Sequence, residues 1–351
     1  MAGATTTRTD SDSTAQRAAH FELVCPAGNV PSLQAAVDNG ADCVYIGLRD
    51  NTNARNFSGL NFDLDGARSG LHYAHSRGAK VFLAINTYPQ PSSWQRWILA
   101  IDTAADLGFD AVIVADPGLM RYAVAAHPHL RLHLSVQGSA TNYEAINFYH
   151  RHFNVRRAVL PRVLSVAQVE QVIKNTPVEI EVFGFGSLCV MVEGRCALSS
   201  YVTGESPNTT GACSPAKAVR WEQKADGLEA RLNGVLINRY GERESAAYPT
   251  LCKGRVKAGE ESYDAIEEPA SLNALELLPE LARIGVVAIK IEGRQRSPAY
   301  VAAVTRVWRQ ALDAYQQDPA EFAVRADWAA NLCRMSEGQS QTLGAYHRPW
   351  K

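Results

Sequence analysis

Four cysteines form the strongest chemical pattern in the sequence. Cys189, Cys196, Cys213 and Cys252 follow the spacing C-x6-C-x16-C-x38-C, among glycines that let the backbone turn tightly. Four thiolates are the ligand set of a tetrahedral zinc site or of an iron–sulfur cluster. Structural zinc sites usually use closely spaced cysteine pairs, so single cysteines this far apart favour a cluster. The alternative is four buried thiols without a metal, because free cysteine is among the most buried residue types.

Composition and charge narrow the class of protein. The chain has 351 residues, seven cysteines, a formal net charge of −1 and a polar segment before Phe21. With no apolar leader in that segment, we expect a cytoplasmic protein, in which clustered cysteines bind metal more often than they form disulfides. The near-neutral charge lacks the basic signature of a nucleic-acid-binding domain. No run of about 18 apolar residues occurs, so we expect no membrane span.

The elements that must position the cysteines alternate between strand and helix. We expect strands over 21–25, 43–47, 80–85, 111–114, 131–135, 158–160, 179–183 and 288–292. We expect helices over 31–39, 64–76, 94–107, 117–127, 143–153, 166–174, 273–284 and 298–315. Such alternation indicates a parallel sheet with crossover helices. Eight units favour a (β/α)8 TIM-like barrel, and a doubly wound sheet is the alternative.

Three segments lie outside this alternation. Residues 1–19 are polar and without periodicity, which predicts a disordered N-terminal tail. The connection 184–272 is too long for an ordinary loop and contains β-like stretches. We therefore interpret it as a cysteine-rich insertion after the seventh strand of a barrel domain spanning 20–317. Residues 318–351 form a C-terminal extension.

Polar residues that alternate with apolar ones predict a pocket. Lys290, Glu292 and Arg294 fall on one face of the eighth strand, and barrel active sites lie at the carboxyl ends of the strands. Such a face can bind a small anion, with Arg294 gripping a carboxylate in a fork; alternatively, the charges only neutralise one another. The candidate substrate-binding residues are Arg55, Asn86, Gln137, Glu181, Lys290, Glu292 and Arg294. No catalytic residue is assigned.

Several motifs carry a resemblance to a known family. They are Glu22-Leu-Val-Cys-Pro-Ala-Gly28, Ala54-Arg-Asn-Phe-Ser58, the stretch from Glu181 to Ser199, and Lys290-Ile-Glu-Gly-Arg294. Over about residues 20–315 the chain resembles the collagenase-like peptidase U32 family. Within the family, the cysteine spacing and the ending Gly344-Ala-Tyr-His-Arg-Pro-Trp350 are most similar to members that serve dioxygen-independent ubiquinone biosynthesis.

The resemblance implies both a cofactor and a reaction. The cofactor is a 4Fe-4S cluster on Cys189, Cys196, Cys213 and Cys252. The implied reaction is hydroxylation of a quinone precursor ring without dioxygen, with prephenate as the hydroxyl donor. A dicarboxylate of this kind suits the predicted anion pocket. Alternatives are an RNA-base hydroxylase of the same family, a cysteine peptidase, or a cluster protein that only scaffolds its partner.

The resemblance also implies partners. They are the homologous protein UbiV, in a heterodimer, and a lipid-binding accessory protein that presents the quinone precursor. Trp328, Tyr346 and Trp350 lie outside the barrel pattern, and aromatic residues are common interface anchors. We therefore expect these three side chains to contact the partner.

Overall fold

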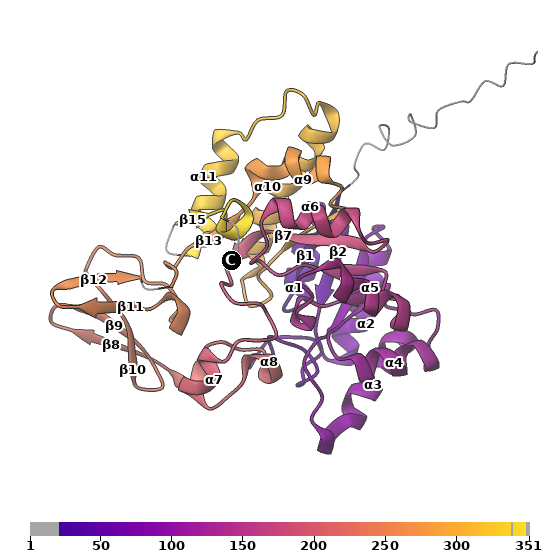
Figure 1. The fold of residues 1–351 in the computed structure, drawn as a ribbon, viewed down its shortest axis with the longest axis horizontal. Helices are drawn as coiled ribbons and strands as arrows, with labels where there is room; N and C mark the ends of the chain where they lie inside the picture. The colour runs from indigo at the N-terminus through magenta and orange to yellow at the C-terminus, as the bar shows by residue number, and fades with distance from the viewer. Residues whose placement is uncertain (1–20, 265, 338–339, 349–351) are drawn as a thin grey trace, which may run out of the picture.

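A computed structural model describes residues 21–264, 266–337 and 340–348, so the expected N-terminal tail and Trp350 lie outside the described residues. Eight parallel strands form a closed barrel at the centre of the molecule (Figure 1). They are β1 (Glu22–Pro26), β2 (Cys43–Ile46), β3 (Lys80–Ile85), β4 (Ala111–Val114), β5 (Leu132–Leu134), β6 (Arg157–Val159), β7 (Glu179–Ser187) and β14 (Ala288–Ile291). The eighth, β14, pairs in parallel with both β1 and β7, which closes the ring and confirms the (β/α)8 prediction.

Amphipathic helices cover the outside of the barrel. They are α1 (Val30–Asp38), α2 (Leu64–His75), α3 (Trp94–Leu107), α4 (Pro117–Ala126), α5 (Tyr143–Phe153), α6 (Val166–Lys174), α9 (Leu278–Ile284) and α10 (Pro298–Gln317). Six of them begin at a residue whose side chain accepts a hydrogen bond from a first-turn amide, as at Asp63, Asp116 and Ser297. Because each capping residue fixes where its helix begins, the observed first residues of these helices lie close to the predicted ones.

One expected helix begins later than predicted. Residues 271–273 form β13 (Ser271–Asn273), which pairs antiparallel with the end of β7, and α9 starts only at Leu278. Leu272 is buried in this ladder. The side chain of Asn273 accepts a hydrogen bond from the amide of Leu275, which turns the chain into the short 3-10 helix η5 (Leu275–Leu277).

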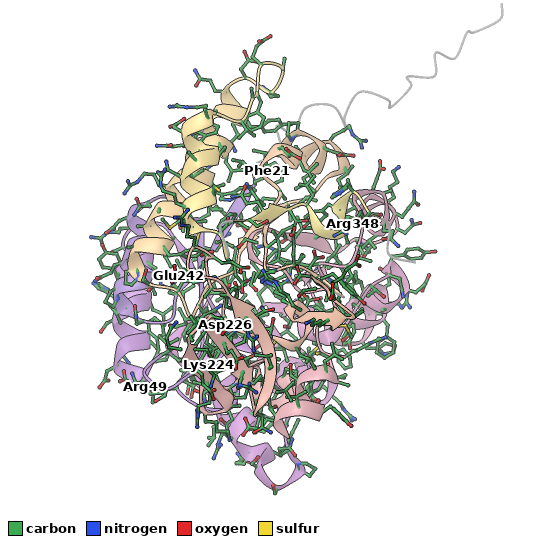
Figure 2. The ribbon with its side chains drawn as sticks, turned by 90° about the vertical axis from the view of Figure 1, so that its left-hand side faces the viewer. Phe21, Arg49, Lys224, Asp226, Glu242 and Arg348 are labelled. Carbon is green, nitrogen blue, oxygen red and sulfur yellow. The ribbon has the colours of Figure 1, made fainter. Side chains whose placement is uncertain are left out.

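The cysteine insertion (residues 184–272) lies to one side of the barrel (Figure 1). Its elements are α7 (Leu198–Thr203), α8 (Pro207–Thr210), η3 (Ala216–Ala218), β8 (Val219–Lys224), β9 (Gly227–Leu232), β10 (Val235–Tyr240), η4 (Leu251–Lys253), β11 (Arg255–Ala258) and β12 (Glu261–Asp264). Asn233 and Gly234 both have positive φ between β9 and β10, as a tight hairpin turn requires. Figure 2 views the molecule from this side, with Lys224 and Asp226 at the turn between β8 and β9.

The C-terminal extension packs against the barrel through α11 (Ala326–Met335) and β15 (Gln341–Thr342). Trp328 is 2% exposed, and its indole N–H donates to Gln310 Oε1 at 3.0 Å. Tyr346 is 7% exposed, and its hydroxyl donates to the carbonyl of Phe183 at 2.6 Å. Both rings fill the protein's own interior, so the expectation that they anchor a partner is wrong.

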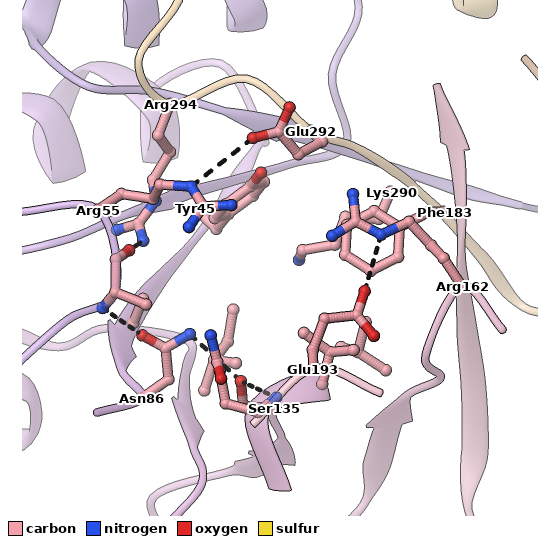
Figure 3. Close-up of a pocket in the computed structure, with 16 residues that line it drawn as sticks. Tyr45, Arg55, Asn86, Ser135, Arg162, Phe183, Glu193, Lys290, Glu292 and Arg294 are labelled. Carbon is pink, nitrogen blue, oxygen red and sulfur yellow. Dashed lines mark hydrogen bonds and ion pairs between the residues drawn. The ribbon is translucent and has the colours of Figure 1, made fainter. Parts of the chain in front are cut away.

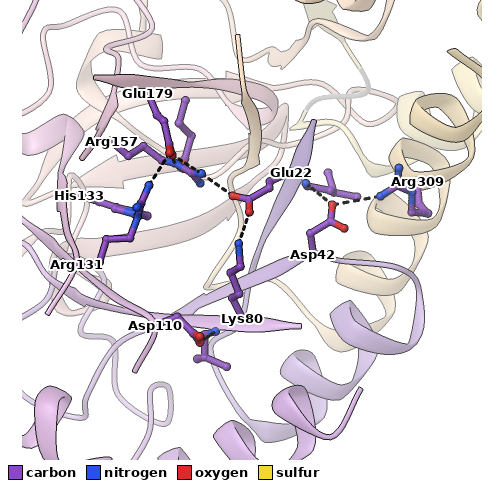
Figure 4. Close-up of polar contacts among 12 residues, drawn as sticks. Glu22, Asp42, Lys80, Asp110, Arg131, His133, Arg157, Glu179 and Arg309 are labelled. Carbon is purple, nitrogen blue, oxygen red and sulfur yellow. Dashed lines mark hydrogen bonds and ion pairs between the residues drawn. The ribbon is translucent and has the colours of Figure 1, made fainter. Parts of the chain in front are cut away.

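Ion pairs fill the barrel at the amino ends of the strands (Figure 4). Arg157 begins β6, and its guanidinium contacts Glu22 at 2.5 Å, Glu179 at 2.8 Å and Glu181 at 3.4 Å. Lys80, the first residue of β3, reaches Glu22 from the other side. Burial alone would raise the pKa of Glu22, but Arg157 and Lys80 lower it to about 2. This floor network, comprising Glu22, Lys80, Arg157, Glu179 and Glu181, occupies the end of the barrel opposite the predicted site.

Within the described residues, no helix is both long enough and apolar enough to cross a membrane.

Candidate functional site

A cavity of about 80 Å³ lies inside the barrel toward the carboxyl ends of the strands (Figure 3). Six of the seven candidate residues line it. They are Arg55, Asn86, Gln137, Lys290, Glu292 and Arg294. We call this space the barrel pocket. Strand parity predicted Gln137, Lys290, Glu292 and Arg294, whereas Arg55 and Asn86 were candidates from loops. The structure brings all six to one pocket and does not test whether they bind a substrate.

The seventh candidate, Glu181, lies outside the lining of this pocket. It is 1% exposed and accepts a hydrogen bond from Lys290 Nζ at 2.7 Å. Lys290 itself lines the pocket, with Nζ 3.9 Å from the ring centre of Tyr45. Burial lowers the pKa of Lys290, although the neighbouring Glu181 opposes that shift. For this pair, the mutual neutralisation considered from the sequence is what the structure shows.

Arg294 is engaged by the protein itself. Its guanidinium donates to Asn53 Oδ1 at 2.9 Å and to the carbonyl of Ala54, and the residue is 4% exposed. Burial lowers its pKa to about 10. Two of its donors therefore hold the loop after β2 in place, whereas a carboxylate-gripping fork requires free donors.

Arg55 lines the barrel pocket and is partly exposed to solvent. Its Nε lies 3.8 Å from Glu292 Oε1, its Nη1 donates to the carbonyl of Gly211 at 2.5 Å, and its side chain is 25% exposed. Its backbone φ is +99°, a conformation that costs a non-glycine residue about 1–3 kcal/mol. Arg55 thus links the barrel to the cysteine insertion, and the surrounding contacts hold it in a strained geometry.

Two further residues that line the pocket were not predicted from the sequence. Arg162 Nε donates to Glu193 Oε1 at 2.8 Å, and its guanidinium carbon lies 4.3 Å from the ring centre of Phe183. Burial raises the pKa of Glu193 although Arg162 opposes the shift. The available signals were the position of Arg162 just after the sixth strand and the location of Glu193 in the Glu-Gly-Arg-Cys motif.

Two glycines fix the cysteine insertion against the barrel. A Cβ at Gly194 would overlap the carbonyl oxygen of Gln137, and one at Gly211 would overlap the backbone of Ala54. Only glycine permits this close approach. The loops that carry Cys196 and Cys213 therefore sit directly on the mouth of the barrel pocket.

The four cysteines of the predicted cluster are half-buried and share one electrostatic neighbourhood. Burial raises the pKa of Cys189 and of Cys252; the Cys213 thiol adds to both shifts, and Cys196 adds to that of Cys252. Cys25 and Cys43 are buried in barrel strands, and Cys333 is exposed.

The thiols do not converge tightly enough for a single ion. Around one zinc ion, neighbouring sulfurs stand about 3.8 Å apart, as Zn–S bonds of about 2.3 Å in a tetrahedron require. In the described part of the chain, no group of three or more His, Cys, Asp or Glu side chains is close enough to hold a metal ion.

The family model described as "Peptidase family U32" matches residues 28–349. The chain belongs to peptidase family U32. The tRNA hydroxylation protein P1 of Bacillus subtilis (strain 168) is 29% identical over 326 residues, which cover 92% of this chain and 70% of that protein. The tRNA hydroxylation protein P of Helicobacter pylori (strain ATCC 700392 / 26695) is 34% identical over 294 residues, covering 83% and 64%.

A third U32 relative has a different name. The collagenase of Porphyromonas gingivalis (strain ATCC BAA-308 / W83) is 31% identical over 310 residues, covering 84% of this chain and 66% of that protein. The chain thus spans about two thirds of the length of these three relatives. Family membership and fold follow from these matches and from the closed barrel.

Proposed function

We propose that this chain is the cluster-bearing subunit of a dioxygen-independent hydroxylase, equivalent to UbiU, which acts with UbiV on the ring of a ubiquinone precursor. The observation that carries the proposal is the seating of the cysteine loops, at Gly194 and Gly211, on the mouth of a polar barrel pocket. The names of the tRNA hydroxylation relatives support the reaction class. The cysteine spacing and the C-terminal ending support the ubiquinone branch of the family.

The barrel pocket, with a volume of about 80 Å³, is proposed to take the carboxylate end of the hydroxyl donor, an anionic molecule such as prephenate. Arg55, whose side chain is 25% exposed, supplies positive charge for its carboxylates. Gln137 Oε1 and Glu193 Oε2 are buried without a hydrogen-bond partner within the described residues. Buried polar atoms normally have partners, so rotation of either side chain toward a bound donor would give these acceptors one.

Cys189, Cys196, Cys213 and Cys252 are proposed to hold a 4Fe-4S cluster. When bound, such a group supplies one-electron transfer. The residues of this chain bind and orient the donor beneath the cysteine loops, while the floor network blocks the opposite end of the barrel.

A deletion strain of the native host, grown without oxygen, tests the substrate. Loss of hydroxylated quinone precursors, restored by this chain together with UbiV, is the expected outcome by mass spectrometry of lipid extracts. Co-expression should also yield a one-to-one complex with UbiV. A monomer that restores anaerobic quinone synthesis without UbiV would contradict the heterodimer.

An RNA-base hydroxylase is the second candidate, favoured by the names of the tRNA hydroxylation relatives. Its test is the nucleoside composition of tRNA and rRNA from the same deletion strain. Loss of a hydroxylated nucleoside with unchanged quinones would replace the first proposal by this one. A cysteine peptidase is disfavoured because the four cysteines of the insertion are proposed as cluster ligands, which leaves none of them free to act as a nucleophile.

A further inference from the structure

A second and larger cavity, of about 640 Å³, lies where three parts of the chain meet. The barrel contributes Arg55, Leu60 and Arg296, the cysteine insertion contributes Cys213 and Tyr248, and the C-terminal extension contributes Arg334. Its volume falls within the range of about 300–1,000 Å³ that is usual for small-molecule sites. We call it the junction cavity.

The junction cavity has a net positive lining. Arg55, Arg296 and Arg334 line it, and Glu337 is the one carboxylate among the described lining residues. Arg55 is paired with Glu292, so the net positive charge comes from Arg296 and Arg334. Glu337 accepts a hydrogen bond from Lys253 Nζ at 2.7 Å in a buried ion pair, so its charge is already neutralised. The Nε of Arg296 is buried and has no hydrogen-bond partner in the described part of the chain. An anionic ligand would pair with the guanidinium groups of Arg296 and Arg334, which line the cavity.

The remaining wall is apolar and aromatic. Phe57, Leu60, Ala246 and Tyr248 contribute to it. The hydroxyl of Tyr248 donates to the carbonyl of Ser214 at 3.1 Å, which fixes the ring although 46% of the residue is exposed. Aromatic and aliphatic walls next to guanidinium groups suit a flat aromatic ring with an acidic substituent.

The position of the cavity relates it to the reaction. Cys213 lines it directly, and Thr250, which also lines it, has its hydroxyl 3.9 Å from Cys252 Sγ. Arg55 lines both the junction cavity and the barrel pocket. A ring in the junction cavity would therefore lie beside the cysteine loops and next to a donor in the barrel pocket.

We propose that the junction cavity binds the oxygen acceptor as an anionic aromatic ring, with Arg296 as a residue that determines specificity for the acidic group. The assignment of the ring as acceptor rests on the proposed hydroxylase function. The binding of the ring to this cavity does not.

Direct binding tests the site without requiring activity. The full chain, purified without oxygen, is titrated with 4-hydroxybenzoate, a ring that carries a carboxylate and a phenol, and affinity is measured by calorimetry or ligand-observed NMR. Arg296→Gln removes one charge-assisted contact and should weaken binding by roughly tenfold to hundredfold. Ala246→Trp should abolish binding, because Ala246 is exposed on the cavity wall and the indole fills the space.

Matched controls separate occlusion from general damage. Ala258→Trp adds the same indole at an exposed position of β11 outside the cavity, and Arg68→Gln removes an exposed charge from α2. Both should leave affinity unchanged. Melting temperatures of all four variants should stay close to that of the unaltered chain, which keeps a loss of binding from reflecting a loss of fold.

The outcomes distinguish the site from the function. Unchanged affinity in Arg296→Gln and Ala246→Trp overturns the site, as does competitive displacement of the ring by prephenate. Equal affinity for cyclohexanecarboxylate overturns its aromatic selectivity. If the ring binds as expected but the complex hydroxylates no quinone precursor, the proposed function fails and the site stands. If Ala246→Trp keeps full hydroxylation, the cavity is not the acceptor site.

Discussion

At the scale of single residues, two arginines that both line the barrel pocket have different roles. Arg294, the expected carboxylate fork, donates to Asn53 and to the Ala54 carbonyl, while Arg55 faces both the barrel pocket and the junction cavity. Strand parity predicted that Arg294 would reach the pocket. It gave no information on whether its donors would be free, because Asn53 and Ala54 lie about 240 residues away in sequence.

The contrast predicts different effects of conservative changes. Arg294→Lys should lower the free energy of unfolding by about 1.5–3 kcal/mol, because an ammonium group cannot reproduce both hydrogen bonds of the planar guanidinium. Arg55→Gln should instead weaken prephenate binding by roughly tenfold to hundredfold with a small change in melting temperature. Arg49→Lys, in an exposed ion pair with Asp63, is the control. If Arg294→Lys weakened prephenate binding and Arg55→Gln lowered only the stability, Arg294 would be the donor-binding residue.

The cysteines carry a prediction about metal content. Purified without oxygen, the chain should contain about four irons and four sulfides. Replacement of Cys189, Cys196, Cys213 or Cys252 by Ala should remove most of the iron, whereas Cys25→Ala and Cys333→Ala should not. Iron and sulfide analysis with absorbance spectra provides the measurement. One tightly bound zinc and no sulfide would disprove the cluster.

At the scale of secondary-structure elements, the two ends of the barrel strands differ in role. The amino ends carry stabilising ion pairs, and the carboxyl ends carry the candidate site. The floor network joins the first residues of β1, β3, β6 and β7, whereas the barrel pocket lies at the opposite ends. Helix-capping residues and apolar periodicity allowed the ends of most barrel strands and helices to be predicted from the sequence to within one or two residues. β9, β11 and β12 were not predicted, because their partly exposed, charge-rich segments lack a clear alternation of apolar residues.

The floor network predicts a defined pH dependence. The pKa of Glu22 is lowered from 4.5 to about 2, which corresponds to about 3 kcal/mol of stability. Because the folded-state pKa is the lower one, this stability is present above about pH 4.5 and is lost as the pH falls toward 2. Glu22→Gln should therefore destabilise the protein by up to about 3 kcal/mol at pH 6 and by much less near pH 2.

Urea denaturation at several pH values measures this difference. Glu280→Gln serves as the control, because Glu280 pairs only loosely with the exposed Arg283, at 3.8 Å, and such surface pairs contribute about 0–1 kcal/mol. A deficit for Glu22→Gln that is the same at every pH would show that Glu22 acts through packing, not through its charge.

At the scale of the whole molecule, a buried ion pair joins the cysteine insertion to the C-terminal extension. Lys253 follows Cys252 directly, and its Nζ contacts Glu337 at 2.7 Å with both side chains nearly inaccessible. The sequence predicted the barrel, the cysteine insertion and the C-terminal extension, but not the contacts that join the insertion to the extension. Lys253 and Glu337 are 84 residues apart, and neither lies in a periodic pattern that indicates a contact.

Glu337→Ala should therefore affect both stability and cluster retention. Loss of one partner from a buried pair typically costs about 3–5 kcal/mol, because the other charge stays buried without compensation. The Lys253 side chain should then move toward solvent and carry the neighbouring Cys252 with it. We expect a lower melting temperature and faster loss of iron to a chelator. Glu267→Ala, which breaks the pair with the exposed Arg348, should change neither. Normal iron retention in Glu337→Ala would show that the C-terminal extension does not stabilise the cluster.

The pairing of β14 with both β1 and β7 has a consequence for biosynthesis on the ribosome. The first seven strands emerge early, but the strand that joins their two free edges follows only after the whole cysteine insertion has been made. Until then the nascent sheet exposes two unpaired edges, which are sites of aggregation. Long-range closure of this kind is also slow. The insertion is therefore synthesised while the barrel is still open, and a variant whose insertion folds slowly should appear first as aggregated chain.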